Sequence, residues 1–270
     1  MAVVESSELE RRFESERIHA SPRVLILAAI GLAVYGVGRL MSLQPGNVVA
    51  SIGMLFILIA LVLHFDHLSF RIGRSAVVLV VLAAIAEGAG CLLRIVGELD
   101  SREMWLHGSA YILGGVAAGA VAVHKERQMK AMLDEYAAGA PWQTRVTVHA
   151  SFLALTTVAC GMVLYGIGLI GLTTDGIRTA LVLMSIGALL VAIGVISHIE
   201  HLVPRLGVVA VGAVILGVLA FAANPLRDLF SSTADLNDHP WWELCLGISA
   251  LLGSLACIIA LQKKRSSDLA

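Results

Sequence analysis

The sequence predicts an all-α fold: a polytopic integral membrane helical bundle with eight transmembrane helices, built as two tandem parallel four-helix repeats. Three observations predict it. The 270-residue chain is 58% hydrophobic and 14% charged, with a mean hydropathy of +0.86. Its apolar residues fall in runs of about 18 or more, which is long enough to cross a bilayer as helices. Short motifs of the first half also return in the second half.

The apolar runs predict eight spans. They cover roughly residues 23–42, 47–65, 74–97, 104–124, 146–171, 177–197, 206–224 and 241–262. Turn sequences separate several of them, namely Gln44-Pro45-Gly46, Thr174-Asp175-Gly176 and Asn224-Pro225. The predicted organisation is therefore a cytoplasmic amphipathic segment (1–22), a first four-helix repeat (23–124), a cytoplasmic linker (125–145), a second four-helix repeat (146–262) and a cytoplasmic tail (263–270). In the linker we expect a helix lying on the membrane surface through Met129, Leu133 and Tyr136.

The two halves share motifs at nearly constant offsets. His19-Ala20-Ser21 returns as His149-Ala150-Ser151, and Tyr35-Gly36-Val37-Gly38 returns at the same offset as Tyr165-Gly166-Ile167-Gly168. His64-Phe65-Asp66-His67, followed by Arg71, returns at a slightly larger offset as His198-Ile199-Glu200-His201, followed by Arg205. Because each half has an even number of spans, both halves are expected to have the same orientation in the membrane.

The distribution of lysine and arginine predicts that both termini are cytoplasmic. In that orientation the inner segments hold 14 of the 19 basic residues, whereas the outer loops hold only Arg102, Arg178 and Arg227. Residues 5–23 carry five Glu and four Arg before the first apolar run, unlike a cleavable signal peptide. We therefore expect a multi-pass protein of a cell inner membrane. Its partner is the lipid bilayer, with other membrane subunits or a second copy as further options, and no basic tract indicates nucleic acid.

The duplicated histidines form two clusters at the predicted cytoplasmic face. Residues spaced i, i+3 on a helix share a face and lie about 5–6 Å apart at Cβ. The candidate metal ligands are His19, His64, His67, His149, His198 and His201, and Asp66 and Glu200 are placed to orient them. Such a set suits Zn, Fe, Cu or Ni, and one histidine from each half could instead hold a haem. Interfacial histidines favoured by helix ends and headgroups, or a pH-sensing role, are the other interpretations.

Three charged residues form a candidate intramembrane cluster in the first half. Arg39 lies in the first predicted span, and Glu87 and Arg94 share one face of the third. A charge at membrane depth normally faces the bundle interior or a partner, so we expect Glu87 to pair with Arg94 or Arg39. The functional interpretation is a binding site or proton relay that opens outward. The structural interpretation is an ion pair, with the arginines reaching toward the outer surface.

Glycine-punctuated hairpins fill the stretch from Gly161 to Pro225, which contains YGIGLIGLTTDGIRTALVLMSIGALLVAIGVI and LGVVAVGAVILGVLAFAANP. This stretch, a quarter of the chain, resembles the small HdeD-type bacterial membrane proteins. That family usually has six spans, and the paired histidine motifs are not part of its pattern. The resemblance implies an acid-stress or envelope role without a defined activity, and it supplies no site residues.

Three functions are compatible with these features. The favoured one is a membrane-embedded binding or redox component whose histidine clusters hold a transition metal or haem. The second is a non-catalytic subunit of a membrane complex, or a stress protein, with interfacial histidines. The third is a small transporter that uses Glu87. Soluble-enzyme classes are disfavoured because the sequence has no phosphate loop and no Ser/His/Asp arrangement, and whether the protein is an enzyme stays open.

Overall fold

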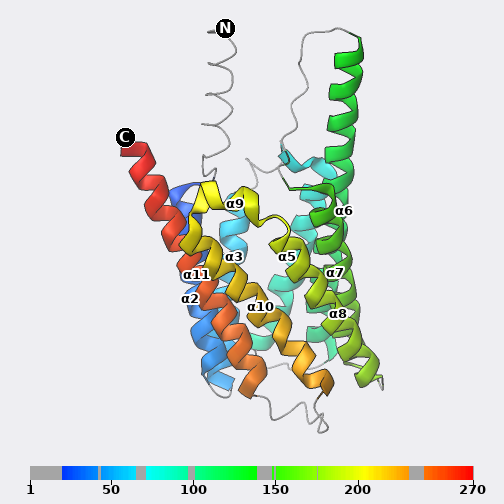
Figure 1. Cartoon of the computed structure of the whole chain (residues 1–270). Helices are drawn as coiled ribbons and strands as arrows, with labels where there is room; N and C mark the ends of the chain where they lie inside the picture. Colours follow the sequence, from blue (N-terminus) through cyan, green and yellow to red (C-terminus); the bar gives the residue numbers. More distant parts are fainter. Residues whose placement is uncertain are drawn as a thin grey trace.

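The structure, a computed structural model, describes residues 20–41, 44–64, 71–96, 101–138, 148, 150–174, 176–230 and 240–269. Within these residues the regular structure is α-helical and contains no strand. Eight of the described helices are long and apolar enough to cross a membrane, so the predicted all-α class and the predicted number of spans are confirmed. They are α2 (Pro22–Leu40), α3 (Gln44–Leu63), α5 (Arg74–Ile95), α6 (Ser101–Ala137), α7 (Phe152–Gly171), α8 (Ile177–Ile196), α10 (Val208–Phe230) and α11 (Pro240–Leu269), and the short α9 (Ile199–Leu206) precedes α10 (Figure 1).

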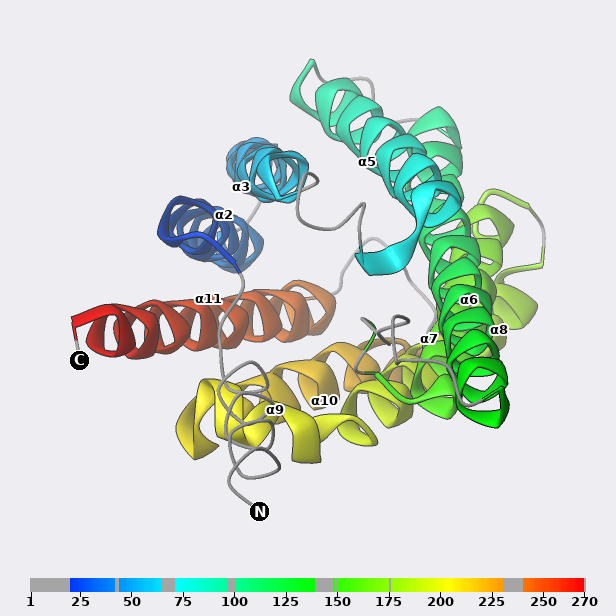
Figure 2. The ribbon, with the colours of Figure 1, turned by 90° about the horizontal axis from the view of Figure 1, so that it is seen from above.

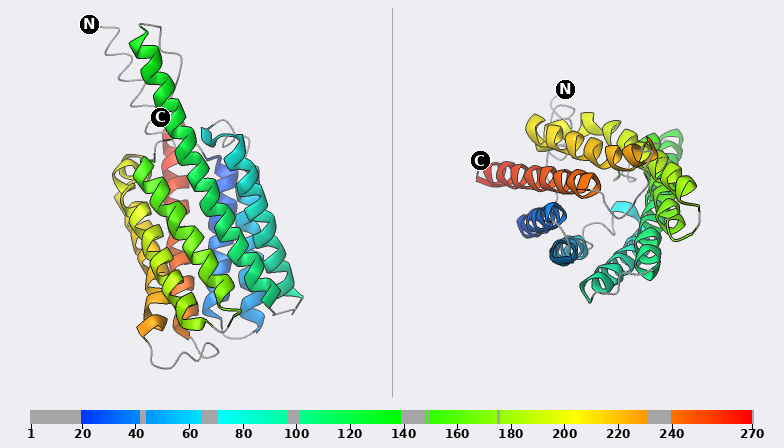
Figure 3. Two further views of the ribbon diagram at one scale, coloured as in Figure 1. Left: turned by 90° about the vertical axis from the view of Figure 1, so that its right-hand side faces the viewer. Right: turned by 90° about the horizontal axis from the view of Figure 1, so that it is seen from below.

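The long helices form a ring (Figure 2). Each packs against two neighbours, in the order α2, α3, α5, α6, α7, α8, α10 and α11, and α11 packs in turn against α2. The helices run side by side between the same two ends of the bundle (Figure 3). Large apolar side chains such as Ile85, Leu153 and Val78 are exposed on the protein surface, as expected for helix faces that contact lipid.

Contacts around the ring are sparsest at two seams, between α3 and α5 and between α8 and α10. These seams divide the ring into two groups of helices. The first group is α5, α6, α7 and α8, and the second group is α10, α11, α2 and α3. Each group therefore combines helices from both halves of the sequence.

Two of the tight seams depend on glycine. Between α2 and α11, a Cβ atom on Gly36 would lie 2.9 Å from the carbonyl oxygen of Gly247. Between α6 and α7, a Cβ atom on Gly166 would lie 2.5 Å from the carbonyl oxygen of Gly108. Both distances are shorter than real Cβ contacts, so these helices meet backbone to backbone. Small residues allow this close packing inside lipid, where no hydrophobic force drives helices together.

The first helix of each half begins at the same kind of cap. Ser21 accepts a hydrogen bond from the backbone N–H of Val24 at 3.3 Å, and α2 begins at the next residue. Ser151 accepts from the N–H of Ala154 at 3.0 Å, and α7 begins in the same way. Serine satisfies an N–H group that would otherwise lack a partner in the first helical turn. Both serines belong to the repeated His-Ala-Ser motif, so the sequence recurrence corresponds to a recurrence of local structure.

A pair of lysines makes matched contacts at the other end of each half. Lys125 Nζ, on α6, donates to the carbonyl oxygen of Ala150 at 2.6 Å. Lys264 Nζ, on α11, donates to the carbonyl oxygen of Ala20 at 2.7 Å. The last helix of each half therefore binds the residue that precedes the N-cap serine of the first helix of the other half. The recurrence visible in the sequence extends to the contacts that close the ring.

Two helices, α6 and α11, continue beyond the ends of the spans that the sequence predicts. Residues 125–137 continue α6 without a break, and the helix projects beyond the bundle (Figure 1). These residues therefore extend a membrane-length helix and do not form a separate helix, and Met129, Leu133 and Tyr136 are exposed on the projecting part. Likewise, α11 continues past residue 262 to Leu269. An apolar run indicates only the part of a helix that lies in the membrane. The polar residues that follow in α6 and α11 include no Gly or Pro, so the helices continue through them.

Candidate functional site

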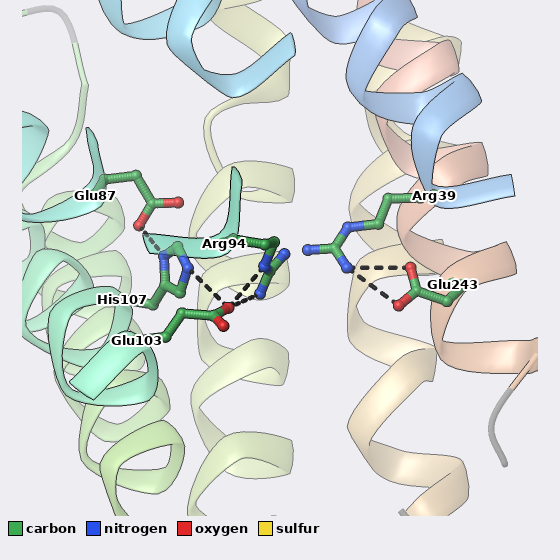
Figure 4. A network of polar contacts seen from close by, with 6 residues as sticks. All are labelled: Arg39, Glu87, Arg94, Glu103, His107 and Glu243. Carbon is green, nitrogen blue, oxygen red and sulfur yellow. Dashed lines mark hydrogen bonds and ion pairs between the residues drawn. The ribbon is translucent and has the colours of Figure 1, made fainter. Parts of the chain in front are cut away.

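Six ionisable side chains from four helices lie together (Figure 4). They are near the ends of α2 and α5 and the starts of α6 and α11, at the end of the bundle away from the C-terminus (Figure 1). They are Arg39 on α2, Glu87 and Arg94 on α5, Glu103 and His107 on α6, and Glu243 on α11. Five of the six side chains are between 4% and 16% exposed, and Glu243 is 38% exposed. Buried charge at membrane depth is costly and requires partners, so the pairing of these groups matters.

On the α5–α6 side, one imidazole links two carboxylates. His107 Nδ1 lies 2.9 Å from Glu87 Oε2. Its Nε2 lies 3.4 Å from Glu103 Oε1, which is within ion-pair range but long for a hydrogen bond. Arg94 donates to the same Glu103 oxygen from Nε at 2.7 Å and also from Nη2. Glu103 and His107 are spaced i, i+4 on α6, so they share the helix face that meets α5.

Gly90 gives the imidazole its place against α5. A Cβ atom at Gly90 would lie 2.9 Å from His107 Cε1 and 3.1 Å from His107 Nε2. The ring therefore rests on the α5 backbone one turn after Glu87. Because Gly90 has no side chain, the imidazole can approach closely enough for Nδ1 to reach the Glu87 carboxylate.

On the α2–α11 side, Arg39 pairs with Glu243. Arg39 Nη1 donates to the two carboxylate oxygens of Glu243 at 3.1 and 3.2 Å. The guanidinium carbon lies 5.2 Å from the centre of the Tyr35 ring, a cation–π distance. Arg39 Nε is buried and has no hydrogen-bond partner among the described residues. The guanidinium groups of Arg39 and Arg94 point toward one another (Figure 4).

The predicted intramembrane cluster lies in one region, but its predicted pairing is wrong. Glu87 contacts the imidazole of His107 and neither Arg94 nor Arg39. Each arginine is instead paired with a carboxylate from the first turns of the helix beside it. The sequence-based pairing fails because the third span faces the fourth, which contributes its own ionisable residues.

Three site residues escape the sequence analysis. Glu103 precedes the fourth predicted span (104–124), yet it lies in the first turn of α6 and is 4% exposed. His107 follows it at i, i+4 within a span, and that spacing is the signal that could identify the pair. Glu243 carries no such signal, because its partner Arg39 lies in the first span, at the far end of the sequence.

Among the described residues, the polar network of Arg39, Glu87, Arg94, Glu103, His107 and Glu243 has no second copy at the position that matches Glu87. At the offset that relates His64 to His198, the position of Glu87 corresponds to Phe221. Phe221 packs against Tyr165 with ring centroids 5.2 Å apart, and Tyr165 in turn packs against Tyr111 at 4.8 Å. The position that matches Glu87 therefore carries an aromatic ring packed against other aromatic rings, in place of a carboxylate.

The candidate metal site can be followed at only two of its six histidines. His64 follows α3, and His198 precedes α9. The remaining members fall outside the description, either as whole residues or as side chains: His19, Asp66, His67, His149, Glu200 and His201. Among the side chains that the structure describes, no group of three or more His, Cys, Asp or Glu could hold a metal ion.

The arginines that follow the two histidine motifs act on each other electrostatically. Arg205 is on α9, outside the long apolar helices, and Arg71 precedes α5. Burial, and then the positive charge of Arg71, lower the pKa of the Arg205 guanidinium below its ordinary value. The two matched positions therefore lie within range of each other's charge at the end of the bundle opposite the polar network.

Comparisons of the chain with protein-family models, with curated proteins and with solved structures find no match. The fold and the site define a class of protein: a multi-pass α-helical membrane protein with a buried network of charged side chains between its helices.

Proposed function

We propose that the protein is a small membrane transporter in which the movement of a solute is coupled to protonation of the Glu87–His107 pair. One observation carries the proposal: a carboxylate and an imidazole from two apolar helices lie 2.9 Å apart, with 16% and 12% of their side chains exposed. Ionisable residues within spans are costly, and they commonly mark ion pathways and proton relays.

The charge balance of the network supports this role. Each arginine already has a carboxylate partner, Glu103 for Arg94 and Glu243 for Arg39. Glu87 and His107 are the remaining groups. With all carboxylates ionised, the network carries a net charge of −1 when the imidazole is neutral and 0 when it is protonated. Uptake of one proton therefore neutralises a buried charge, a change large enough to bias a conformational equilibrium.

The arrangement of the ring supports movement around the site. The two groups of helices meet at the sparse α3–α5 and α8–α10 seams. Arg94, Glu103, His107 and Glu87 belong to the first group, whereas Arg39 and Glu243 belong to the second. Rocking of one bundle against another around a central site is a common mechanism of alternating access.

We also propose an orientation of the protein in the membrane. The basic residues favour an inner-membrane protein with both termini in the cytoplasm, and two like-oriented four-helix repeats account for the matched serine caps and lysine contacts. In that orientation the polar network lies near the outer face. Fusion of a reporter to the C-terminus tests it: a cytoplasmic reporter must be active and a periplasmic one inactive.

The transport function is tested on proteoliposomes by the proton current, recorded as the change in internal pH with a trapped fluorescent dye, because a carboxylate that moves together with one proton carries no net charge across the membrane. Small solutes of each charge class, namely carboxylates, ammonium compounds and zwitterions, are applied in turn with a pH gradient. We expect a proton-dependent current with one class. Glu87→Gln and His107→Gln are each expected to reduce that current at least about tenfold, as is typical for loss of an essential proton-transfer group.

The chain offers a matched control on the same helix. His124 lies further along α6, about 25 Å from His107 by the helical rise, and contacts Gln128 at 3.1 Å. His124→Gln removes an imidazole without touching the network and is expected to leave the current unchanged. Absence of current for every solute class, or currents unaffected by both Glu87→Gln and His107→Gln, would refute the proposal and favour a non-transporting subunit of a membrane complex.

A transition metal or haem held by the duplicated histidines remains a second proposal. Its support is the recurrence of both histidine motifs at matched positions in the two halves. Imidazole suits several transition metals as well as haem iron. The elemental content and visible spectrum of the purified protein distinguish this proposal from interfacial histidines.

A further inference from the structure

We infer that Arg39 and Arg94 together form a binding site for a small carboxylate, which is the solute of the proposed transporter. This inference rests on the proposed function and deepens it by naming the substrate class. The two guanidinium groups come from different helix groups, α2 and α5, and point toward one another across the inner side of the ring (Figure 4). Both act electrostatically on the buried thiol of Cys91, which places them in one neighbourhood.

The hydrogen bonding of the two arginines leaves capacity for a ligand. A guanidinium has five N–H donors. Arg39 uses Nη1 for both oxygens of Glu243, while its buried Nε has no partner among the described residues. Arg94 directs Nε and Nη2 to a single oxygen of Glu103. Each arginine is thus anchored on one side, and a buried N–H of Arg39 is left to be satisfied.

Between the two guanidinium groups the local field favours an anion, and it does so most when His107 is protonated, because the network is then neutral before the anion binds. Two positive charges that face one another in a region of low dielectric repel. An anion between them attracts both, and a carboxylate matches the planar fork of a guanidinium better than a spherical ion does. Because Arg39 and Arg94 belong to the two different helix groups, a bound carboxylate would bridge the groups and bias their relative position.

The same charge balance couples the carboxylate to the proton. An added anion gives the network a net charge of −2 when His107 is neutral and −1 when it is protonated. Anion binding therefore favours the protonated imidazole, and protonation favours anion binding. The ionisable groups that act on the imidazole are Glu87 and Arg94 on α5 and Glu103 on α6. Cys91 on α5 and Tyr111 on α6 lie within electrostatic range of both Glu87 and Arg39.

Binding is measured on the detergent-purified protein, independently of transport, by thermal unfolding followed through tryptophan fluorescence. Sodium acetate is the probe, with sodium chloride at equal ionic strength as the comparison. We expect a saturable increase in the unfolding temperature with acetate and little with chloride. The apparent affinity for acetate should rise as the pH falls, and this dependence should be lost in His107→Gln.

Arg39→Gln and Arg94→Gln should each abolish the saturable effect of acetate. Arg39→Lys keeps the charge beside Glu243 but loses the fork, so it should fold and bind acetate about tenfold more weakly. Arg178→Gln is the control, since Arg178 is exposed at the start of α8, at the same end of the bundle.

An equal response to acetate in wild type, Arg39→Lys and Arg94→Gln would overturn the site, and an equal response to chloride and acetate would overturn the carboxylate class. Acetate binding without proton-dependent current would leave this site standing and refute the transport function. A current that requires Glu87 and His107, in a protein that does not bind acetate, would refute this site and leave the transport function standing.

Discussion

His107 Nδ1 lies 2.9 Å from Glu87 Oε2, between neighbouring helices that are both apolar enough to cross a membrane. The imidazole also approaches Glu103 at 3.4 Å and rests against the backbone at Gly90. The imidazole lies between two carboxylates and beside two arginines that already have partners, and uptake of one proton by the Glu87–His107 pair brings the net charge of the network from −1 to 0.

Two neighbouring glycines on α5 provide a test of the position of His107. A Cβ atom at Gly90 would meet the imidazole at 2.9 Å, whereas a Cβ atom at Gly88 would meet Leu58 Cδ1 at 3.5 Å, an ordinary contact. Gly90→Ala should displace the imidazole from Glu87 and reduce the proton-dependent current about tenfold or more. Gly88→Ala should leave it intact. Both changes favour helix formation, so equal currents in the two variants would argue against a requirement for the observed His107 position.

The two ion pairs should differ in their contribution to stability. Glu103 is 4% exposed and Glu243 is 38% exposed. Removing one partner of a buried pair leaves an uncompensated charge, so Glu103→Gln should lower the free energy of unfolding by about 3–5 kcal/mol. Glu243→Gln also leaves a buried arginine, Arg39 at 11% exposed, but water can reach the vacated carboxylate position. This variant should therefore lower the free energy of unfolding by less, about 1–3 kcal/mol. Unfolding in mixed detergent measures both, and a larger loss for Glu243→Gln would contradict the burial seen here.

Helix packing offers a third test. A Cβ atom on Gly166 would lie 2.5 Å from the backbone of α6, while Gly212 on α10 has nothing within 4 Å of such an atom. Gly166→Ala should force α6 and α7 apart and destabilise the protein by about 1–3 kcal/mol. Gly212→Ala should not destabilise it. The two unfolding free energies decide the matter, and similar values for both variants would show that the α6–α7 seam is looser than described.

The metal or haem proposal has its own test. It predicts that the purified protein contains stoichiometric metal, or shows a Soret band, and that the His64→Ala/His198→Ala double variant loses it. Elemental analysis and the visible spectrum make the measurement. A colourless, metal-free and stable preparation would leave the histidines as interfacial residues.

Much of the fold follows from the sequence. Runs of about 18 or more apolar residues predict the eight spans because a bilayer sets their length. The positions at which α6 and α11 end are not predicted, because hydropathy indicates where a helix leaves the lipid and not where its backbone hydrogen bonding stops. The helix α6 shows the difference, because its 37 residues extend well beyond the apolar span predicted at 104–124.

The candidate site is only partly predictable, because the sequence gives spacing along one helix but not the contacts between helices. Spacing along one helix brings together Glu103 and His107, since such neighbours share a face. Pairs between helices depend on the order of helices around the ring, as in the contact of Arg39 with Glu243. The sequence indicates that Arg39 and Glu87 must have partners, but it does not identify them.

The central claim is coupling between protonation of Glu87–His107 and solute movement. It is tested most directly by asking whether a pH gradient alone, with equal solute concentrations on both sides of the proteoliposome membrane, drives the current. We expect current in the wild-type protein and in His124→Gln, and none in Glu87→Gln. A wild-type current that is the same with and without the pH gradient would contradict the account.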